Sequence, residues 1–289
     1  MKDLTARLFV LLQRLLPKQL LTRFVFRVAR IRQVPIKNFL IRRFVQLFKV
    51  NTSELVHPVP DGYPTFNHFF VRELSAEART VDRDANTITS PVDGTVSACG
   101  CIEGDQIFQA KGLRYSLTDL IATDTDEAAA YVDGAFATLY LAPYNYHRVH
   151  APLAGTVKSV HYVPGTLFSV NDATVRYLPS LFARNERVVC HIETGSGPMI
   201  IVFVGAMNVG TINTKWTGDI RPRRHGVVED IALDDQDLDF DKGDPLGWFN
   251  MGSTIILILP PGSSNDFDVI EAGQSIRMGE AIGRLQDDQ

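Results

Sequence analysis

The sequence predicts a mainly β protein of the α+β class, in which an antiparallel β-sandwich or barrel body follows basic amphipathic helices at the N-terminus. Three observations support this prediction. Short apolar runs separated by turn residues fill the chain from about residue 57 onward, Leu and Phe recur at helical spacing in residues 1–50, and one turn motif occurs twice. A length of 289 residues with 45% hydrophobic content suits one large globular domain or two small ones.

Charge divides the chain into two regions. Residues 1–50 contain twelve Lys/Arg and one acid, a net charge of +11, whereas the whole chain carries −4 and the remainder therefore −15. A basic arm on an acidic body is expected to bind an anionic surface. We therefore predict a membrane-association region over residues 1–50 and a mainly β domain over residues 51–289.

The basic arm is expected to form three helical pieces, separated by Pro17 and Pro35. Its longest unbroken apolar run, residues 8–12, is far shorter than the ~18–20 residues that span a bilayer. No signal-peptide cleavage site follows this run. Basic helices rich in Leu and Phe are typical of an interfacial membrane anchor. A helical subdomain that packs its apolar faces on the body is the alternative. Nucleic-acid binding is not expected, because the aromatic residues lie on the apolar faces and no binding motif is present.

The body contains several β-branched or otherwise apolar runs that predict strands, at residues 137–141, 188–192, 199–204 and 255–259. Short helices are expected at residues 65–73 and 117–121. The last run is predicted to be a fully buried strand, and Gly252, Ser253 and Thr254 stand directly in front of it. Such a triplet is an ordinary strand entry or a peptide bond set up to break, since Gly offers an unhindered carbonyl and Ser a neighbouring oxygen.

The repeated turn motif links two distant segments. Residues 90–96 (SPVDGTV) match residues 151–157 (APLAGTV), and both are expected to feed a strand in a body with internal pseudo-duplication. The copies differ at one informative place, where Asp93 in the first corresponds to Ala154 in the second. A residue needed only for the turn should occur in both copies, so Asp93 is a candidate for chemistry; an Asx-type turn role is the alternative.

Two histidines precede the second copy of the motif. His147 and His150 lie three residues apart in the sequence YNYHRVH, between two prolines. In a flat strand their rings would point to opposite faces, whereas a turn could bring them to one site. Satisfied structural histidines are the alternative.

Neither cysteines nor acidic residues predict a metal site. Three cysteines are too few for a disulfide framework and suggest reduced thiols. The acidic stretch at 229–244 has aspartates at calcium-loop spacing but lacks the Gly and the Glu that such a loop requires, and we expect no bound metal.

Together these motifs resemble the bacterial phosphatidylserine decarboxylases. The resemblance is carried by PVDGTV around Asp93, by YHRVH at residues 146–150 and by GST at residues 252–254. Further blocks of this sequence match those of the family in residue type and in order, at residues 66–74, 109–117, 162–171, 181–187 and 204–210. The likeness runs from about residue 50 to the C-terminus. One departure is Met251, where the family usually has Leu.

The resemblance implies a zymogen that cuts itself between Gly252 and Ser253, leaving a β chain of residues 1–252 and an α chain of residues 253–289. It implies that the Ser253 hydroxyl attacks the Gly252 carbonyl, with His150 as general base and Asp93 orienting it. The resulting ester would then eliminate to give a pyruvoyl group derived from Ser253.

The implied reaction is the conversion of phosphatidylserine to phosphatidylethanolamine through a Schiff base on the pyruvoyl group, which acts as the electron sink. His147 is expected to serve the decarboxylation stage by returning a proton. The expected partners are phosphatidylserine, an anionic membrane surface and the enzyme's own second fragment, with a homodimer left open. The expected location is the cytoplasmic face of the inner membrane, held peripherally.

Three alternatives remain at this point. One is a pyruvoyl-dependent decarboxylase of a soluble amine-bearing substrate, against which the basic arm argues. Another is a hybrid-barrel metallopeptidase or carrier domain that uses Asp93, His147 and His150. The last is a non-enzymatic lipid-binding module, whose chain would stay intact.

Overall fold

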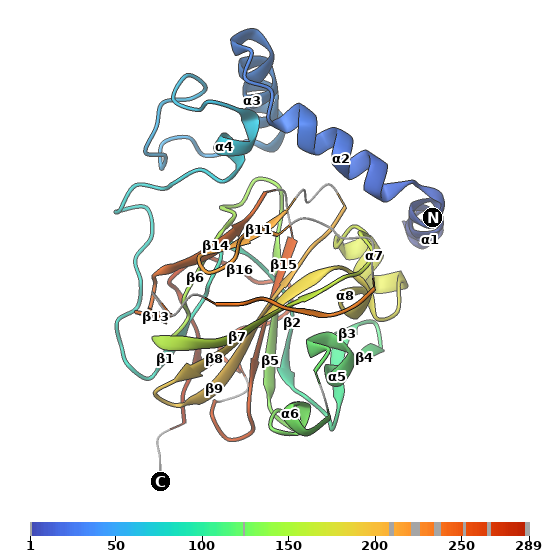
Figure 1. Ribbon diagram of the computed structural model, residues 1–289, viewed down its shortest axis with the longest axis vertical. Helices are drawn as coiled ribbons and strands as arrows, with labels where there is room; N and C mark the ends of the chain where they lie inside the picture. Colours follow the sequence, from blue (N-terminus) through green and yellow to red (C-terminus); the bar gives the residue numbers. More distant parts are fainter. Residues whose placement is uncertain are drawn as a thin grey trace.

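Antiparallel sheets make up the body of the protein, and helices cover one end of it (Figure 1). The computed structural model describes residues 2–123, 125–207, 211–220, 226–233, 238–250, 253–264 and 267–286, with only the backbone of Lys2, Thr125 and Ser253. The mainly β fold class with leading helices is confirmed. Among the described strands the large sheet is open, since β12 and β16 at its two ends pair with one neighbour each, so the body is sandwich-like and not a closed barrel.

The helices of the described chain are α1 (Lys2–Leu15), α2 (Lys18–Ala29), α3 (Val34–Phe48), α4 (Phe66–Phe70), α5 (Leu117–Ile121), α6 (Thr125–Ala129), α7 (Asp172–Tyr177) and α8 (Leu181–Arg184). The strands are β1 (Thr87–Thr89), β2 (Gly94–Cys101), β3 (Gln106–Ala110), β4 (Leu113–Ser116), β5 (Ala135–Leu141), β6 (Arg148–His150), β7 (Gly155–Val163), β8 (Arg187–Thr194), β9 (Gly197–Val204), β10 (Ile212–Thr214), β11 (Gly218–Ile220), β12 (Glu229–Asp230), β13 (Asp239–Phe240), β14 (Pro245–Phe249), β15 (Ser253–Leu259), β16 (Ser275–Ile276) and β17 (Ala281–Arg284).

The large sheet has β15 at its centre. Its strand order is β12-β7-β8-β9-β15-β5-β2-β16, with β13 also paired to β7. Residues 254–258 pair on both sides, with β9 and with β5. Side chains 255–259 are at most 2% exposed, because a central strand of a covered sheet is buried on both faces. The predicted buried strand is therefore confirmed.

A second sheet lies beside the first, with the order β11-β10-β14-β6. Its strands include the segment that follows His147 and the segment that leads to Asn250. Phe249 of this sheet packs on Phe203 of the large sheet, with ring centroids 5.5 Å apart. The interior between the two sheets therefore has an aromatic contact near the ends of β14 and β9.

The repeated motif starts two equivalent strands. Gly94 opens β2 and Gly155 opens β7, and in each strand the pairing shifts register just after the Thr-Val pair. Both glycines are required by close approach of the neighbouring strand. An added Cβ would stand 2.5 Å from the Tyr140 carbonyl oxygen at position 94, and 2.6 Å from the Glu193 carbonyl oxygen at position 155.

The three arm helices, α4 and α5 occur where the sequence predicts them, whereas α6, α7 and α8 were not predicted. Pro17 and Pro35 separate or open the three arm helices, and Thr65 caps α4 by accepting a hydrogen bond from the His68 amide. The helix expected at residues 65–73 is shorter than predicted, ending at Phe70. A small core between α3 and α4, centred on Ile41 and Phe69, is separate from the main core of the sheets.

Gly155→Ala is expected to lower the free energy of unfolding by about 1–3 kcal/mol, because the new methyl group collides with the backbone of β8. Urea unfolding followed by circular dichroism measures the change. Gly195→Ala is the matched control, since a Cβ at position 195 meets nothing within 4 Å. Equal unfolding midpoints for the two variants would contradict the close-packing argument.

Candidate active site

The backbone of Ser253 begins β15 and pairs with Leu141 of β5. Gly252, the other residue of the predicted cleavage site, lies outside the described residues. The segment that leads to this point is held firmly, because the Phe249 amide donates to the His147 carbonyl at 3.1 Å and the Asn250 amide donates to the Thr211 carbonyl at 3.1 Å. The predicted scissile position is therefore the junction between the small and the large sheet.

Asp93 is buried in the turn before β2 and paired with a cation. Arg79 donates through Nε to Oδ1 at 2.8 Å and through a terminal nitrogen to Oδ2, in a bidentate arrangement. The Met278 amide also donates to Oδ1, at 3.0 Å. Glu54 shares the same arginine at 3.1 Å, and these hydrogen bonds and charges raise the pKa of Arg79 above its usual value. Ala154 in the second copy of the motif is exposed, so the turn does not require a buried carboxylate.

His150 ends β6 with both ring nitrogens engaged. Nδ1 lies 2.8 Å from the Gly243 carbonyl oxygen, which can only accept, so Nδ1 carries the proton. Nε2 then accepts from the Tyr146 hydroxyl, 3.0 Å away. Burial lowers the pKa of His150 below its usual value, so the ring is neutral at pH 7, with the lone pair of Nε2 directed at a hydroxyl group. This is the protonation state that a general base needs.

The structure brings Asp93 and His150 into neighbouring segments without a direct hydrogen bond between their side chains. The His150 amide donates to the Pro91 carbonyl at 2.8 Å, which ties β6 to the turn that carries Asp93. The Asp93 charge also favours the protonated form of His150 and so opposes the effect of burial on its pKa. The orienting position at Nδ1 is filled by Gly243, and the orienting role of Asp93 stays a prediction.

His147 is fully buried and lies between the turn at residues 143–145 and the start of β6, so the pair forms neither the flat strand nor the single turn considered from the sequence. Its ring packs against Phe70 with centroids 4.1 Å apart, and neither ring nitrogen has a hydrogen-bond partner among the described residues. Burial, followed by the charge of Arg72, lowers the pKa of His147 well below 6.5. The ring is therefore neutral at pH 7, although the nearby Asn145 backbone opposes part of this lowering of its pKa.

Several residues of the site were not singled out from the sequence. Arg72 donates to the carbonyl oxygens of Tyr144 and Asn145, each at 2.9 Å, and so fixes the turn before His147. Asn250 accepts from Asn67 at 2.8 Å and donates to Thr211. Arg72 and Asn67 belong to the block at residues 66–74 that carried part of the resemblance. The hydrogen bonds of Arg72 and Asn67 with segments distant in the sequence show which parts of the site these two residues position.

Within the described ranges, no three His, Cys, Asp or Glu side chains are grouped so as to hold a metal ion. Asp93, His147 and His150 are thus each surrounded by protein groups of other kinds.

Comparison with known proteins identifies the family. A family model described as phosphatidylserine decarboxylase matches residues 66–284, and a second, described as PSD, matches residues 8–49. The chain belongs to the phosphatidylserine decarboxylase family. The phosphatidylserine decarboxylase proenzyme of Marinobacter nauticus is 44% identical over 280 residues, which cover 96% of this chain and 98% of that protein.

Two further relatives carry the same description. The proenzyme of Methylococcus capsulatus is 42% identical over 98% of both chains, and that of Acidovorax ebreus is 46% identical over 96% of this chain and 97% of its own. The predicted family and enzyme class, a decarboxylase made as a proenzyme, are confirmed. The metallopeptidase, carrier and purely lipid-binding alternatives are wrong.

Arg79→Gln is expected to destabilise the fold by about 3–5 kcal/mol, because it leaves the buried Asp93 carboxylate without its cation. Thermal unfolding measures the loss. Adding Asp93→Asn should recover much of the stability, since the unpaired charge is then removed. Arg83→Gln, at an exposed arginine four residues away, is the control. A stability loss that the second substitution leaves unchanged would show that the ion pair is not the cause.

Proposed function

We propose that this decarboxylase cuts itself between Gly252 and Ser253, keeps the resulting pyruvoyl group at position 253, and uses it to convert phosphatidylserine to phosphatidylethanolamine at a membrane surface. The observation that carries the proposal is the position of Ser253 at the start of the central strand, directly after a segment whose Phe249 amide is hydrogen-bonded to the carbonyl of the buried His147, three residues before the neutral His150. The family's proenzyme descriptions support processing of this kind.

His150 is the base of the self-cleavage in this proposal. Its protonated Nδ1 is anchored on Gly243, so Nε2 carries the lone pair that can take a proton from a hydroxyl group, and it already accepts a hydrogen bond from the hydroxyl of Tyr146. Asp93 stabilises the positive charge that the ring then acquires, acting through space from the neighbouring turn. Arg79 in turn holds Asp93 in place through two hydrogen bonds.

The site fits a pyruvoyl group at position 253. Both nitrogens of His147 are buried without a partner, which is costly unless a polar group joins them. The Thr254 hydroxyl is likewise buried and unpartnered among the described residues. When present, the pyruvoyl group supplies an electron sink for the loss of carbon dioxide.

His147 is suited to hold and return a proton beside that group. Phe70 covers one side of its ring, and Arg72 fixes the turn before it, so the ring has little freedom to move. Water is excluded by the same contacts. A neutral imidazole in such a place takes up a proton only during the reaction, which is the behaviour the reprotonation step requires.

Processing should leave the two fragments together. Residues 253–289 amount to 37 residues, fewer than usually fold alone. They supply the central strand β15 as well as β16 and β17, which pair with β2 and β1 of the larger fragment. Separating the fragments would therefore dismantle the large sheet.

Mass spectrometry of the purified protein tests the central claim. We expect two fragments, residues 1–252 and 253–289, with the smaller blocked at its N-terminus by a pyruvoyl group. Ser253→Ala should remain a single intact chain, because Ala has no oxygen to attack the preceding carbonyl. Ser275→Ala, which removes an exposed serine from the same fragment, should be cut like the wild type. Cleavage of Ser253→Ala would overturn the proposal.

The N-terminal helices are proposed as the membrane-association region. None of the described helices is long and apolar enough to cross a membrane. The leucines predicted to share one face of α1 are exposed, among them Leu8 (56%), Leu12 (55%) and Leu15 (78%). The opposite side of α1 contacts the body, where Val10 is buried and Gln13 bonds to Ser169 and Thr174. The apolar stripe therefore faces outward, as in an interfacial helix.

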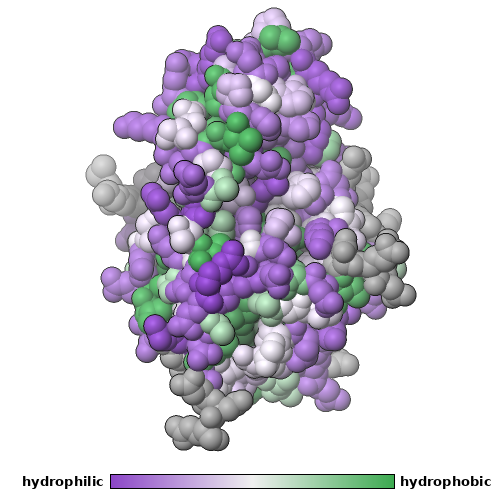
Figure 2. Space-filling model, turned by 90° about the vertical axis from the view of Figure 1, so that its left-hand side faces the viewer, coloured by the Kyte–Doolittle hydropathy of each residue, from purple (hydrophilic) through white to green (hydrophobic). Residues whose placement is uncertain are grey.

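The outward apolar surface continues on α2 and α3. Leu20, Phe24 and Phe39 are each more than 60% exposed. One face of the molecule carries hydrophobic patches among hydrophilic side chains at the helical end as well as on the body (Figure 2). Large exposed apolar groups in such number are unusual for a water-facing surface and are typical of a lipid contact.

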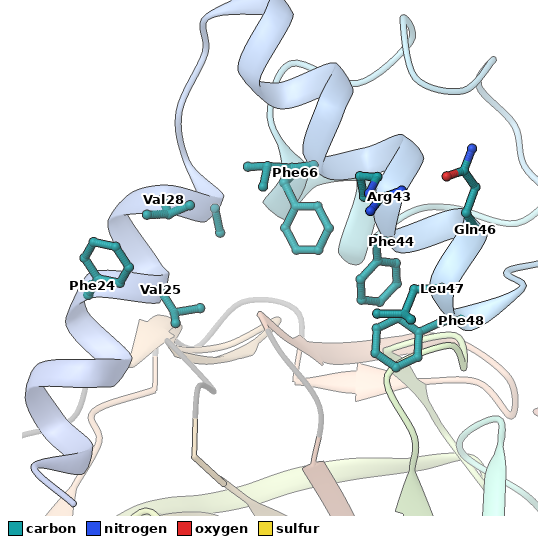
Figure 3. A pocket seen from close by; sticks show the side chains of 11 residues that line it. Phe24, Val25, Val28, Arg43, Phe44, Gln46, Leu47, Phe48 and Phe66 are labelled. Atoms are coloured by element: carbon teal, nitrogen blue, oxygen red, sulfur yellow. The ribbon is translucent and has the colours of Figure 1, made fainter.

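A cavity of about 510 Å³ opens between α2 and α3. Side chains of the two helices line it from opposite sides, with Phe66 between them (Figure 3). Its lining is mostly apolar, and Arg43 stands at its edge. The cavity is suited to an acyl chain whose anionic head group meets the arginine, which is the chemistry of the proposed substrate.

Leu8, Leu12 and Leu15→Ser together should weaken binding to anionic vesicles at least about tenfold, because the inserted side chains supply much of the affinity. Flotation with phosphatidylcholine vesicles containing a quarter phosphatidylglycerol measures this binding. Removal of residues 1–34 should weaken it further, although that deletion also strips Gln13 from the body.

Self-cleavage should persist in both membrane-binding variants. Val227 and Val228→Ser are the control, since these valines are also exposed but lie on the body. Unchanged flotation of the leucine variant would rule out the arm as the anchor.

A further inference from the structure

Glu186 is a buried acid that the roles above leave unused. It lies just before β8 and is 2% exposed. The Tyr162 hydroxyl donates to its Oε2 at 3.2 Å. Burial raises the pKa of Glu186 to about 8, and the hydrogen bond from Tyr162 lowers it only in part. The side chain is therefore a carboxylic acid with its proton at pH 7, and no cation is paired with it among the described residues.

The strand register places Glu186 in the same row as Ser253. Arg187 pairs with Val204, and Val204 pairs with Thr254 across β8, β9 and β15. One residue further toward the junction, the Gly205 amide donates to the Glu186 carbonyl at 2.8 Å. Continuing the same register, the position of Ser253 falls beside Gly205 on its other side. Extended by one residue beyond the paired parts of β8 and β9, the register thus places Glu186, Gly205 and Ser253 in one row.

The carboxyl group of Glu186 lies over Gly205. A Cβ at position 205 would stand 2.9 Å from Cγ and 3.1 Å from Oε1 of Glu186, so any side chain there would displace the acid. Gly205 has none, and the space above it is open to Glu186. Oε1 of the acid therefore lies over Gly205, on the side of β8 that leads to β15, while Oε2 accepts from Tyr162 of β7.

Glu186 also lies on the face that meets the small sheet. Residues two apart on a strand share a face, so Glu186 lies on the side of Val188, and Val188 pairs with Phe203. Phe203 packs on Phe249, whose amide donates to the carbonyl of His147. Arg187 turns to the other face, where it donates to the carbonyl oxygens of Leu120 and Asp119.

We propose that Glu186 is a further residue of the active site, and that its carboxyl group donates a hydrogen bond to the carbonyl group that processing leaves at position 253. This inference rests on the proposed function. A donor at a carbonyl oxygen makes the carbonyl carbon more reactive toward an amine. As the carbon–nitrogen bond forms, the carboxyl proton passes to the oxygen, and the proton of the attacking amine returns to the carboxylate. No oxidant or other co-reactant is needed.

The proposal predicts a pH dependence with a definite sign. The donor is present below the pKa of about 8 and is lost as the pH rises through that value. The titratable group in contact with Glu186 is Tyr162 from β7. Gly205, which follows β9, contributes no side chain, and the charge of Arg187 is directed to the other face. Removing the Tyr162 hydroxyl should raise the pKa of Glu186, because that hydroxyl stabilises the carboxylate.

The reaction of the processed protein with phenylhydrazine tests this directly, without measuring decarboxylation. Phenylhydrazine is an uncharged nucleophile over the pH range needed, and the labelled 253–289 fragment is identified by mass. In the wild type we expect a labelling rate that is constant below pH 8 and falls above it. Glu186→Gln should lack the falling limb and react about tenfold more slowly below pH 8. Tyr162→Phe should shift the limb to higher pH.

Glu193→Gln, an exposed glutamate on the same strand, should keep the wild-type profile. If the labelling rate of Glu186→Gln still falls above pH 8, the proposed role of Glu186 is overturned and the proposed function is not. A wild-type protein that is neither cut nor labelled would overturn the proposed function and this inference with it. Should Glu186→Gln fail to process, Tyr162→Phe decides, because an unmoved limb in that variant would also overturn the inference.

Discussion

The pairing of β15 with a strand on each side is the constraint on which the rest of the structure depends. A strand held by β5 and β9 along residues 254–258 cannot shift by one residue without turning its buried side chains to the opposite faces. This fixes the start of the strand, and therefore position 253, relative to every other strand of the sheet. It also explains how a backbone break beside it can be tolerated, since hydrogen bonds across the sheet hold both ends.

Around this fixed point, the protein sets buried ionisable groups in different states by giving them different partners. Asp93 is paired bidentately with Arg79, so a carboxylate persists in the interior. Glu186 keeps its proton because burial raises its pKa more than the hydrogen bond from Tyr162 lowers it. His147 and His150 are both neutral because they are buried. The proposed site thus combines an acid and two neutral bases with the Asp93–Arg79 pair, which is the division of labour that acid–base chemistry requires.

The two sides of helix α1 differ in a similar way. Its inward side is tied to the body by a few specific groups, such as Gln13 against Ser169 and Thr174, and its outward side leaves Leu and Phe exposed. The body can therefore fold around β15 while the helices present an apolar, positively charged surface. Helix α4 connects the helical arm to the candidate site. Its Phe66 packs on Phe44 of α3, and its Phe70 packs on the ring of His147.

Local patterns in the sequence determined the central strand, the arm helices and the choice of Asp93 as a candidate. The apolar run at residues 255–259 predicted the central strand, helical spacing predicted α1 to α3, and the difference between Asp93 and Ala154 in the repeated motif marked the buried acid. Its alternative role in the turn alone is not supported by the exposed Ala154. These features depend on neighbours in the chain, which the sequence displays directly.

The tertiary structure alone decided which distant groups meet. Arg79 as the partner of Asp93, Gly243 as the anchor of His150 and Gly205 beneath the carboxyl group of Glu186 all join segments with no common local pattern. The state of each acid and base follows from burial and from these partners, and neither quantity is a property of the residue type. The sequence thus determined the strands, the helices and the candidate residues, whereas the fold decided their protonation states and their geometry.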